Sequence, residues 1–232
     1  MADCLVIAVD GPSGSGKSSA ARGAARALGV RYLDTGAMYR ALTWWLLTHQ
    51  VDVTSPALVA ASATKPAIEV GTDPDGPYTT VDGIDVSGPI RERAVSNAVS
   101  VVAVVPEVRT HLIARQREII AKACAEAGGI VAEGRDIGTV VAPDAVVKVF
   151  LTASETARAR RRAADLTADP AVTVELTQAE QARRDRLDAA QSERAVDAVP
   201  IDSTQLGVAE VIAEIVALAQ SRWPSAGPAW MA

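Results

Sequence analysis

The sequence predicts an α/β fold with a five-stranded parallel sheet flanked by helices. Three observations lead to this prediction: short apolar runs recur along the chain, segments of helical periodicity separate them, and a glycine-rich loop joins the first run to the first helix. Strands that alternate with helices form parallel sheets with right-handed crossovers. With 232 residues and a hydrophobic share of 49%, the chain fits one α/β domain carrying an insertion or a lid.

The first strand and the first helix enclose the glycine-rich loop. We expect the strand over residues 4–10 and the helix from Lys17 to Leu28, where Gly29 provides a C-cap. The loop fits the pattern G-x-x-x-x-G-K-[ST] with Gly11, Pro12, Ser13, Gly14, Ser15, Gly16, Lys17 and Ser18. Its glycines let backbone N–H groups surround phosphate oxygens, and the helix N-terminus adds partial positive charge.

This strand–loop–helix context predicts a phosphate-binding loop, or P-loop, that binds a nucleoside triphosphate. Lys17 would reach the β- and γ-phosphates, and the Ser18 hydroxyl would bind Mg²⁺.

Polar residues separate the second strand, expected over residues 30–33, from the next helix, expected over residues 37–49. Asp34 and Thr35 stand at this junction. Polar residues at the carboxyl end of a strand lie where open α/β sheets bind ligands. The same two residues equally suit a plain turn with an N-cap.

An insertion interrupts the alternation of strands and helices. Short β-like runs and the turn signals Asp-Pro-Asp-Gly-Pro and Asp-Gly follow one another between residues 62 and 89. We therefore expect a small antiparallel β subdomain, assigned to residues 62–105. Pro89 then opens a short helix that carries Arg91 and Arg93.

The rest of the chain returns to alternating helices and strands. The expected helices cover residues 106–127, a segment capped by Ser154, residues 175–188 and residues 208–223, and the expected strands cover residues 129–132, 146–151 and 198–201. Pro200 suits a strand at the edge of the sheet. The Pro/Gly/Ala-rich residues 224–232 are expected to be disordered.

Arginines are concentrated at the start of one helix, at Arg158, Arg160, Arg161 and Arg162. Phosphoryl transfer between two anionic substrates requires that their charges be collected, aligned and shielded from water. Arginines on a mobile segment can close over such a site, so residues 158–185 are interpreted as an Arg-rich lid. The alternative is a helix exposed to solvent, which is what we expect for Arg115 and Arg117.

Composition and charge argue against several classes of function. The net charge of −5 disfavours general nucleic-acid binding, which needs a basic face. No apolar run approaches about 18 residues, so no membrane span is expected. The chain enters its first strand too soon for a signal peptide, and two scattered cysteines, Cys4 and Cys124, fit a reducing cytosol. We therefore expect a cytoplasmic protein that binds neither nucleic acid nor membranes.

A P-loop alone leaves three classes of protein open: a GTPase switch, a small-molecule kinase, and an ATPase motor or assembly module. No N-K-x-D guanine-reading motif follows a strand. The strand over residues 129–132 leads to one acid, Glu133, whereas motors usually carry paired acids there. The arginine cluster and the acidic overall charge favour a kinase.

Four motifs together resemble the bacterial cytidylate kinases, a family of nucleoside monophosphate kinases. They are the P-loop, Leu-Asp-Thr-Gly-Ala-Met-Tyr-Arg at 33–40, Asp-Val-Ser at 85–87 with Ile-Arg at 90–91, and Glu-Gly-Arg-Asp-Ile-Gly-Thr-Val-Val at 133–141. The likeness runs from the first strand to about Asp188. It implies an enzyme that transfers the γ-phosphate of ATP to CMP or dCMP with Mg²⁺ as cofactor. The family also carries an insertion in its monophosphate-binding region.

The resemblance also implies which residues form the site. ATP would be bound by residues 11–18 together with Ser19. Catalysis would depend on Lys17, Arg135, Arg158, Arg161 and Arg162. CMP would be bound by Thr35, Tyr39, Arg40, Ser100, Arg109, Arg135, Asp136, Arg184, Asp188 and Arg194.

The chemistry of cytidine monophosphate agrees with these assignments. Asp136 can accept a hydrogen bond from the N4 amino group of cytosine, and Arg109 and Ser100 can serve its O2 and N3 atoms. Arg40 and Arg135 suit the phosphate, because the planar guanidinium matches it. Asp188 and Arg184 would then hold the ribose hydroxyls.

The sequence departs from the family pattern after Asp188. An arginine of the family is replaced by Gln191 in an alignment without a gap, and supplied by Arg194 if a short insertion is allowed; we prefer Arg194. We expect a monomer whose partners are its small-molecule substrates. Another small-molecule P-loop kinase and a nucleotide-gated binding module are the alternatives.

Overall fold

The computed structural model describes residues 4–165 and 174–224, with the side chains of residues 162–165, 174–176 and 190 left out. The middle of the expected lid therefore lies outside the described residues. The same is true of the expected disordered tail, apart from its first residue.

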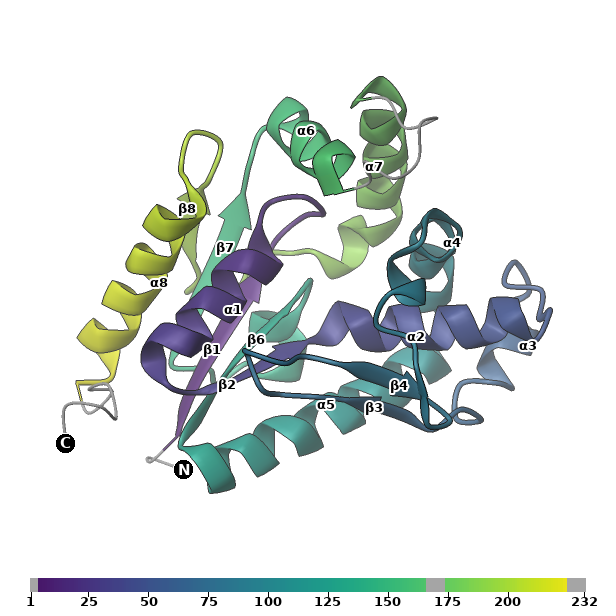
Figure 1. The fold of residues 1–232 in the computed structure, drawn as a ribbon, viewed down its shortest axis with the longest axis horizontal. Helices are drawn as coiled ribbons and strands as arrows, with labels where there is room; N and C mark the ends of the chain where they lie inside the picture. The colour runs from purple at the N-terminus through teal and green to yellow at the C-terminus, as the bar shows by residue number, and fades with distance from the viewer. Residues whose placement is uncertain (1–3, 166–173, 225–232) are drawn as a thin grey trace.

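A five-stranded parallel sheet forms the centre of the molecule (Figure 1). Its strands are β1 (Leu5–Asp10), β2 (Arg31–Asp34), β6 (Gly129–Gly134), β7 (Val147–Thr152) and β8 (Val199–Asp202). They lie in the order β2-β6-β1-β7-β8, and each neighbouring pair is parallel. The predicted α/β fold is confirmed, and β8, which contains Pro200, lies at an edge as expected.

Helices connect the strands, most of them at places predicted from sequence. They are α1 (Lys17–Leu28), α2 (Thr35–Thr48), α3 (Pro56–Ala60), α4 (Arg93–Ala103), α5 (Pro106–Ala127), α6 (Glu155–Asp165), α7 (Val174–Asp188) and α8 (Val208–Arg222). Shorter helical turns are η1 (Pro89–Arg91), η2 (Ile137–Val141) and η3 (Ala189–Gln191). Helix α3, the turns η2 and η3, and the full length of α4 were not predicted; η2 is a π-helical turn. Within the described ranges, no helix combines the length and apolar character needed to cross a membrane.

Helices cover both faces of the sheet. Successive side chains of a strand point to opposite faces, so each strand contributes to a buried cluster on either side. Leu5 and Ile7 of β1 belong to the buried cluster that includes α1 and α8, whereas Ala8 belongs to the cluster that includes α2 and α5. A Cβ at Gly23 of α1 would lie 2.2 Å from Ile212 Cδ1 of α8. The glycine therefore allows these two helices to touch.

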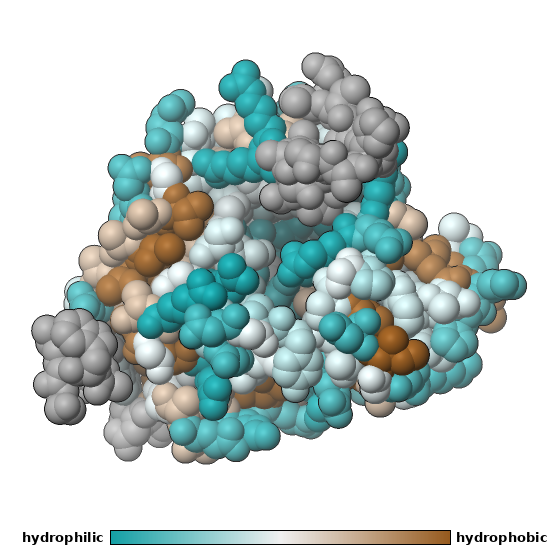
Figure 2. All heavy atoms as spheres, in the orientation of Figure 1, coloured by the Kyte–Doolittle hydropathy of each residue, from teal (hydrophilic) through white to brown (hydrophobic). Residues whose placement is uncertain are grey.

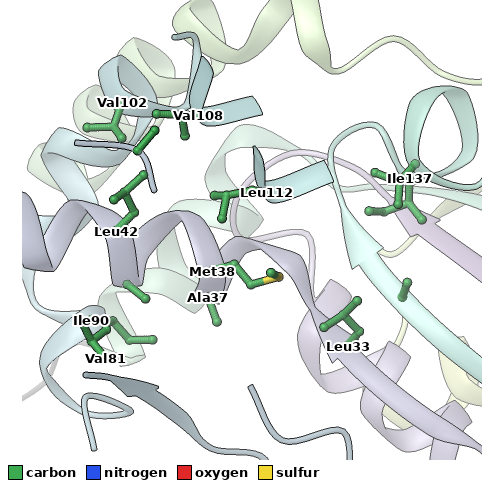
Figure 3. Packing of buried hydrophobic residues seen from close by; sticks show 14 of the residues in the cluster. Leu33, Ala37, Met38, Leu42, Val81, Ile90, Val102, Val108, Leu112 and Ile137 are labelled. Atoms are coloured by element: carbon green, nitrogen blue, oxygen red, sulfur yellow. The ribbon is translucent and has the colours of Figure 1, made fainter. Parts of the chain in front are cut away.

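The insertion forms a second, antiparallel sheet of β3 (Ile68–Val70), β4 (Thr79–Val81) and β5 (Ile84–Asp85). Its buried side chains join the core of the main domain: Val81 and Ile90 belong to the same cluster as Met38 and Leu42 of α2 (Figure 3). Helix α2 thus packs against the insertion as well as against α5, which places the start of α2 firmly beside β6.

Cys4 and Cys124 are joined by a disulfide, with their Cα atoms 5.2 Å apart and their positions 120 apart in the sequence. The prediction of two scattered thiols is therefore wrong. Cys4 directly precedes β1, and Cys124 lies in the last turn of α5, which leads into β6. Because Leu5 of β1 pairs with Gly129 of β6, the two cysteines meet at the amino edge of the sheet.

Candidate active site

A cleft of about 1080 Å³ opens at the carboxyl edge of the parallel sheet. It is lined by the loop after β1, the starts of α1 and α2, the middle of α4, the residues after β6 and the end of α7. Figure 2 shows a hollow on this face with hydrophilic side chains around it. Open α/β sheets bind ligands at this edge, so the geometry defines one candidate site.

The P-loop turns its backbone toward this cleft. Gly11, Gly14 and Gly16 have φ angles of 148°, 77° and 92°, which favour glycine over any other residue. The Nζ atom of Lys17 donates to Pro12 O at 2.8 Å across the loop. A neutral carbonyl is a weaker partner for an ammonium than a phosphate oxygen, so Lys17 can exchange it for an anionic ligand.

A buried acid, Glu133, lies near Lys17 at the end of β6. Glu133 is 3% exposed, and the hydroxyl of Tyr32 donates to its Oε1 at 2.6 Å. Burial and then the Asp34 carboxylate raise the pKa of Glu133. Burial and then the Arg135 guanidinium lower the pKa of Lys17 to about 7. Charges are thus held in a poorly hydrated corner of the cleft, where electrostatic interactions are strong.

The start of α2 presents polar groups to the cleft. Asp34 is the N-cap of α2: its Oδ1 accepts from Ala37 N at 2.8 Å, and its Oδ2 accepts from Arg40 Nη2 at 2.7 Å. Thr35 Oγ1 donates to Glu133 O at 2.7 Å, which ties α2 to β6. Asp34 and Thr35 therefore start the helix and also line the cleft.

Opposite the P-loop, α4 and α5 bring Ser100 and Arg109 to the residue that follows Arg135. Arg109 Nη2 donates to Asp136 Oδ2 in an ion pair between α5 and the loop after β6. Ser100 is 2% exposed, and its Oγ has no hydrogen-bond partner among the described residues. A buried hydroxyl without a partner costs free energy, so a ligand that supplies one would gain affinity here. Tyr39 lines the same pocket, and burial raises its pKa to about 12.

Arg135 lies between the P-loop and this pocket. Its Nη1 donates to Gly11 O at 2.9 Å, and its Nε pairs with Asp188 Oδ2 at 3.2 Å. Arg184, one turn before Asp188 on α7, also lines the cleft. The guanidinium groups of Arg135 and Arg184 therefore lie in the part of the cleft between the P-loop and the end of α7.

One arginine of α6 reaches the cleft from above the P-loop. Arg161 Nη1 donates to Ser15 O at 3.3 Å and to Ser203 Oγ at 2.9 Å, and Arg161 lines the cleft. Arg160, its neighbour, is exposed, and the side chain of Arg162 lies outside those described. A solvent-exposed helix therefore describes Arg160 but not Arg161.

Helix α7 packs against α6 and also against α4 (Figure 1). Arg158 of α6 donates to Ser13 O at 3.1 Å and pairs with Asp185 of α7 at 2.6 Å, behind the cleft lining. On the other side, Glu180 of α7 pairs with Arg93 of α4 at 2.7 Å. The described parts of the expected lid thus connect the P-loop with α4, which belongs to the segment 62–105 assigned to the insertion.

Some positions differ from those predicted from sequence. Gln191 lines the cleft, whereas Arg194 is exposed and does not line it. Asp10, Glu133 and Ser203 were not predicted as site residues. Asp10 and Glu133 each end an apolar strand before a glycine, which is a signal the sequence contains. Ser203 offered no such signal, because its position depends on β8 lying beside β7.

A P-loop at one end of a cleft and arginine–carboxylate pairs at the other define a P-loop kinase that acts on small molecules. Over residues 7–221 the chain matches the family described as Cytidylate kinase. The chain belongs to the cytidylate kinase family and is an enzyme of the nucleoside monophosphate kinase type.

Curated relatives agree with the family. The cytidylate kinase of Streptomyces griseus is 49% identical over 222 residues, which cover 94% of each chain. That of Rhodococcus opacus is 47% identical over 226 residues, which cover 94% of this chain and 96% of the relative. Among solved structures, shikimate kinase from Acinetobacter baumannii in complex with shikimate is 13% identical and covers 96% of both chains, with a TM-score of 0.46. So low a score carries no functional argument.

Proposed function

We propose that this enzyme phosphorylates CMP and dCMP with ATP, yielding CDP or dCDP and ADP. The observation that carries the proposal is that the Arg109–Asp136 pair and the unpartnered Ser100 hydroxyl line the same cleft as the P-loop. This pocket offers a carboxylate acceptor and two donors at the edge where a base would lie. Cytosine presents the complementary set, an N4 amino donor with O2 and N3 acceptors.

The donor nucleotide would bind along the P-loop. Backbone N–H groups of residues 11–19 and the Lys17 ammonium would hold its phosphates. The Ser18 hydroxyl, with the Glu133 carboxylate lining the same corner, offers the oxygen ligands that suit Mg²⁺, which would neutralise phosphate charge when bound.

The acceptor nucleotide would displace existing ion pairs. Arg40 and Arg135 are held by carboxylates, and the phosphate of CMP would compete for both guanidinium groups. Arg184 and Asp188 would hold the ribose. Gln191 is the better candidate than Arg194 for the remaining family position, because it lines the cleft.

In-line transfer needs alignment more than proton transfer. An oxygen of the CMP phosphate attacks the γ-phosphorus of ATP while the bond from that phosphorus to the β–γ bridging oxygen breaks, and ADP leaves. The attacking oxygen is already anionic, so no general base is required. Lys17, Arg135 and Arg161 would stabilise the charge of the transferred group, with Arg158 and Arg162 as the further arginines of the lid.

The test is ADP formation from ATP with each of CMP, dCMP, UMP, AMP and GMP. We expect CMP and dCMP to react fastest, and equal rates with AMP or GMP would refute the base assignment. Tight ATP binding without turnover on any acceptor would favour a nucleotide-gated binding module instead.

Asp136→Asn tests the residue assigned to the base. It replaces a charged acceptor with an amide. The preference for CMP over the other nucleoside monophosphates should fall by about 10- to 100-fold, on the order of 1.5–3 kcal/mol. Asp144→Asn is the control, because Asp144 is an exposed carboxylate in the turn after η2. Unchanged base preference in the Asp136 variant would remove Asp136 from this role.

We also propose that the enzyme acts as a monomer in the cytoplasm. All residues assigned to the two nucleotides come from a single chain, so the site needs no second copy. Light scattering after size-exclusion chromatography should give the mass of one chain, and a dimer would contradict the proposal.

A further inference from the structure

The loop that carries Arg135 and Asp136 is held from behind by a buried carboxylate. Asp10, the last residue of β1, is 5% exposed. Its Oδ1 accepts from Ile137 N at 2.8 Å, and its Oδ2 accepts from Gly138 N at 2.8 Å. Each carboxylate oxygen therefore fixes one peptide group of the turn that directly follows Asp136.

The π-helical turn η2 is also fixed at its other end. Arg117 of α5 donates from Nη2 to Val140 O at 2.7 Å and from Nε to Val141 O at 3.1 Å. A carboxylate at the N–H end and a guanidinium at the carbonyl end both match the dipole of a helical turn. Between them, the Ile137 side chain is fully buried in the core (Figure 3). The turn therefore has little freedom to shift.

Asp10 acts behind the cleft surface. Asp10 itself does not line the cleft. Gly11 follows it in the chain and Asp136 lies close to it, and of these two neighbours Asp136 lines the cleft. A Cβ at Gly138 would lie 3.2 Å from Lys148 Cδ and 3.4 Å from Asp10 Oδ2, so the peptide of Gly138 is enclosed on both sides. Asp10 therefore acts on the acceptor pocket through the loop that it holds.

We propose that Asp10 is a positioning residue for the acceptor nucleotide: it sets the backbone from which Arg135 and Asp136 reach the substrate. This inference rests on the proposed function, in which Asp136 reads cytosine. Asp10 also directly precedes the P-loop, and Arg135 donates to Gly11 O at 2.9 Å. The same few residues therefore set the spacing between the P-loop and the acceptor pocket.

The first test is Asp10→Asn, which keeps the size of the side chain. One of its two terminal atoms becomes an NH₂ group, which must face a backbone N–H that now has no acceptor. The KM for CMP should rise about 10-fold, and the preference for CMP over UMP should fall by a similar factor, while the KM for ATP stays within about threefold. An unchanged KM for CMP, or equal increases for both substrates, would overturn the positioning role.

Asp82→Asn is the matched control for this variant. Asp82 also accepts two hydrogen bonds, from Ala67 N at 2.8 Å and from Trp45 Nε1 at 3.0 Å. It lies in the insertion, and its own side chain does not line the cleft. It should leave both KM values and the base preference unchanged. A shift in base preference equal to that of Asp10→Asn would show a general structural effect and overturn the inference.

A second pair of variants tests the other end of η2 from the protein surface. Arg117→Ala should raise the KM for CMP about three- to fivefold with the KM for ATP unchanged, because two hydrogen bonds to η2 are lost. Arg115 is an exposed arginine of the same helix and pairs with Glu118. Arg115→Ala should therefore have no effect on either KM. Equal kinetics for the two variants would contradict the inference.

The outcomes separate the two proposals. A parent enzyme without preference for CMP refutes the proposed function. A parent enzyme that prefers CMP, with Asp10 and Arg117 variants that keep the same preference and the same KM for CMP, refutes only the positioning role.

Discussion

The two edges of the parallel sheet are held together by different interactions. At the carboxyl edge, charged groups are buried near one another, with Lys17 close to Glu133 and Arg109 paired with Asp136. Moving charges out of water costs free energy that such pairs recover only in part. This edge carries the site at some expense of stability.

At the amino edge, covalent and backbone bonds take the place of charges. The Cys4–Cys124 disulfide joins the start of β1 to the end of α5, and Leu5 N donates to Gly128 O at 2.9 Å. None of these four residues lines the cleft. The comparison indicates that the carboxyl edge of the sheet carries the candidate site, whereas the amino edge carries contacts that stabilise the fold. Changes at the carboxyl edge should lower activity and spare stability, and changes at the amino edge should do the reverse.

Lys17→Met is expected to have the largest effect. It removes the charge that we propose faces the transferred phosphate, so kcat should fall about 10³-fold, on the order of 4 kcal/mol. The melting temperature should change little, because burial already raises the pKa of Glu133, which can take up a proton when the neighbouring Lys17 charge is removed. Lys122→Met is the control, since that side chain is 73% exposed and lies on α5. A much lower melting temperature in the Lys17 variant would break the comparison between the edges.

Replacing both cysteines by serine tests the amino edge. In buffer without reductant, the free energy of unfolding should fall by about 2–4 kcal/mol, because the disulfide restricts the unfolded chain. Both kcat and KM should stay within about twofold, since the disulfide lies at the edge opposite the cleft. Denaturant unfolding with and without reductant measures the effect. A parent chain equally stable in both buffers would contradict it.

Arg161→Ala and Arg160→Ala compare two neighbours on α6. Arg161 contacts Ser15 and Ser203 beside the P-loop, whereas Arg160 is exposed. We expect kcat to fall about 10- to 100-fold for the Arg161 variant and to change little for the Arg160 variant. Steady-state kinetics with saturating ATP and CMP provide the measurement. Similar losses in both variants would mean that net charge, and not the contact with the P-loop, matters.

Ser100→Ala gives the smallest expected effect and the sharpest comparison. The KM for CMP should rise about three- to tenfold, because the proposed hydrogen bond from Ser100 to the base would be lost. The melting temperature should rise slightly, because a buried hydroxyl without a partner is removed. Ser221→Ala, at an exposed position of α8, is the control. A drop in stability with unchanged KM would assign Ser100 to the core instead of the site.

The donor half of the site was predictable because its residues are contiguous. The P-loop motif, the strand before it and the helix after it all lie within residues 5–28, and the structure places them as predicted. The acceptor half could be proposed only through family resemblance. Arg109 and Asp136 are 27 residues apart, and Arg135 and Asp188 are 53 apart, so no local pattern pairs them.

Other features were beyond the reach of local patterns. The two cysteines looked scattered because their positions lie 120 apart in the sequence. Asp10 is bonded to a turn 127 residues away, and Ser203 meets Ser15 across 188 residues. Each of these contacts depends on the order of the strands in the sheet, and periodicity along the chain contains no information about that order.

The sequence by itself determined the strands, most of the helices, the P-loop and the inserted antiparallel segment, because apolar spacing, capping residues and glycine positions act over a few residues. Only the tertiary structure decided which arginines meet which carboxylates and which cysteines meet. These contacts follow from the order β2-β6-β1-β7-β8, which brings distant strand ends to a common edge.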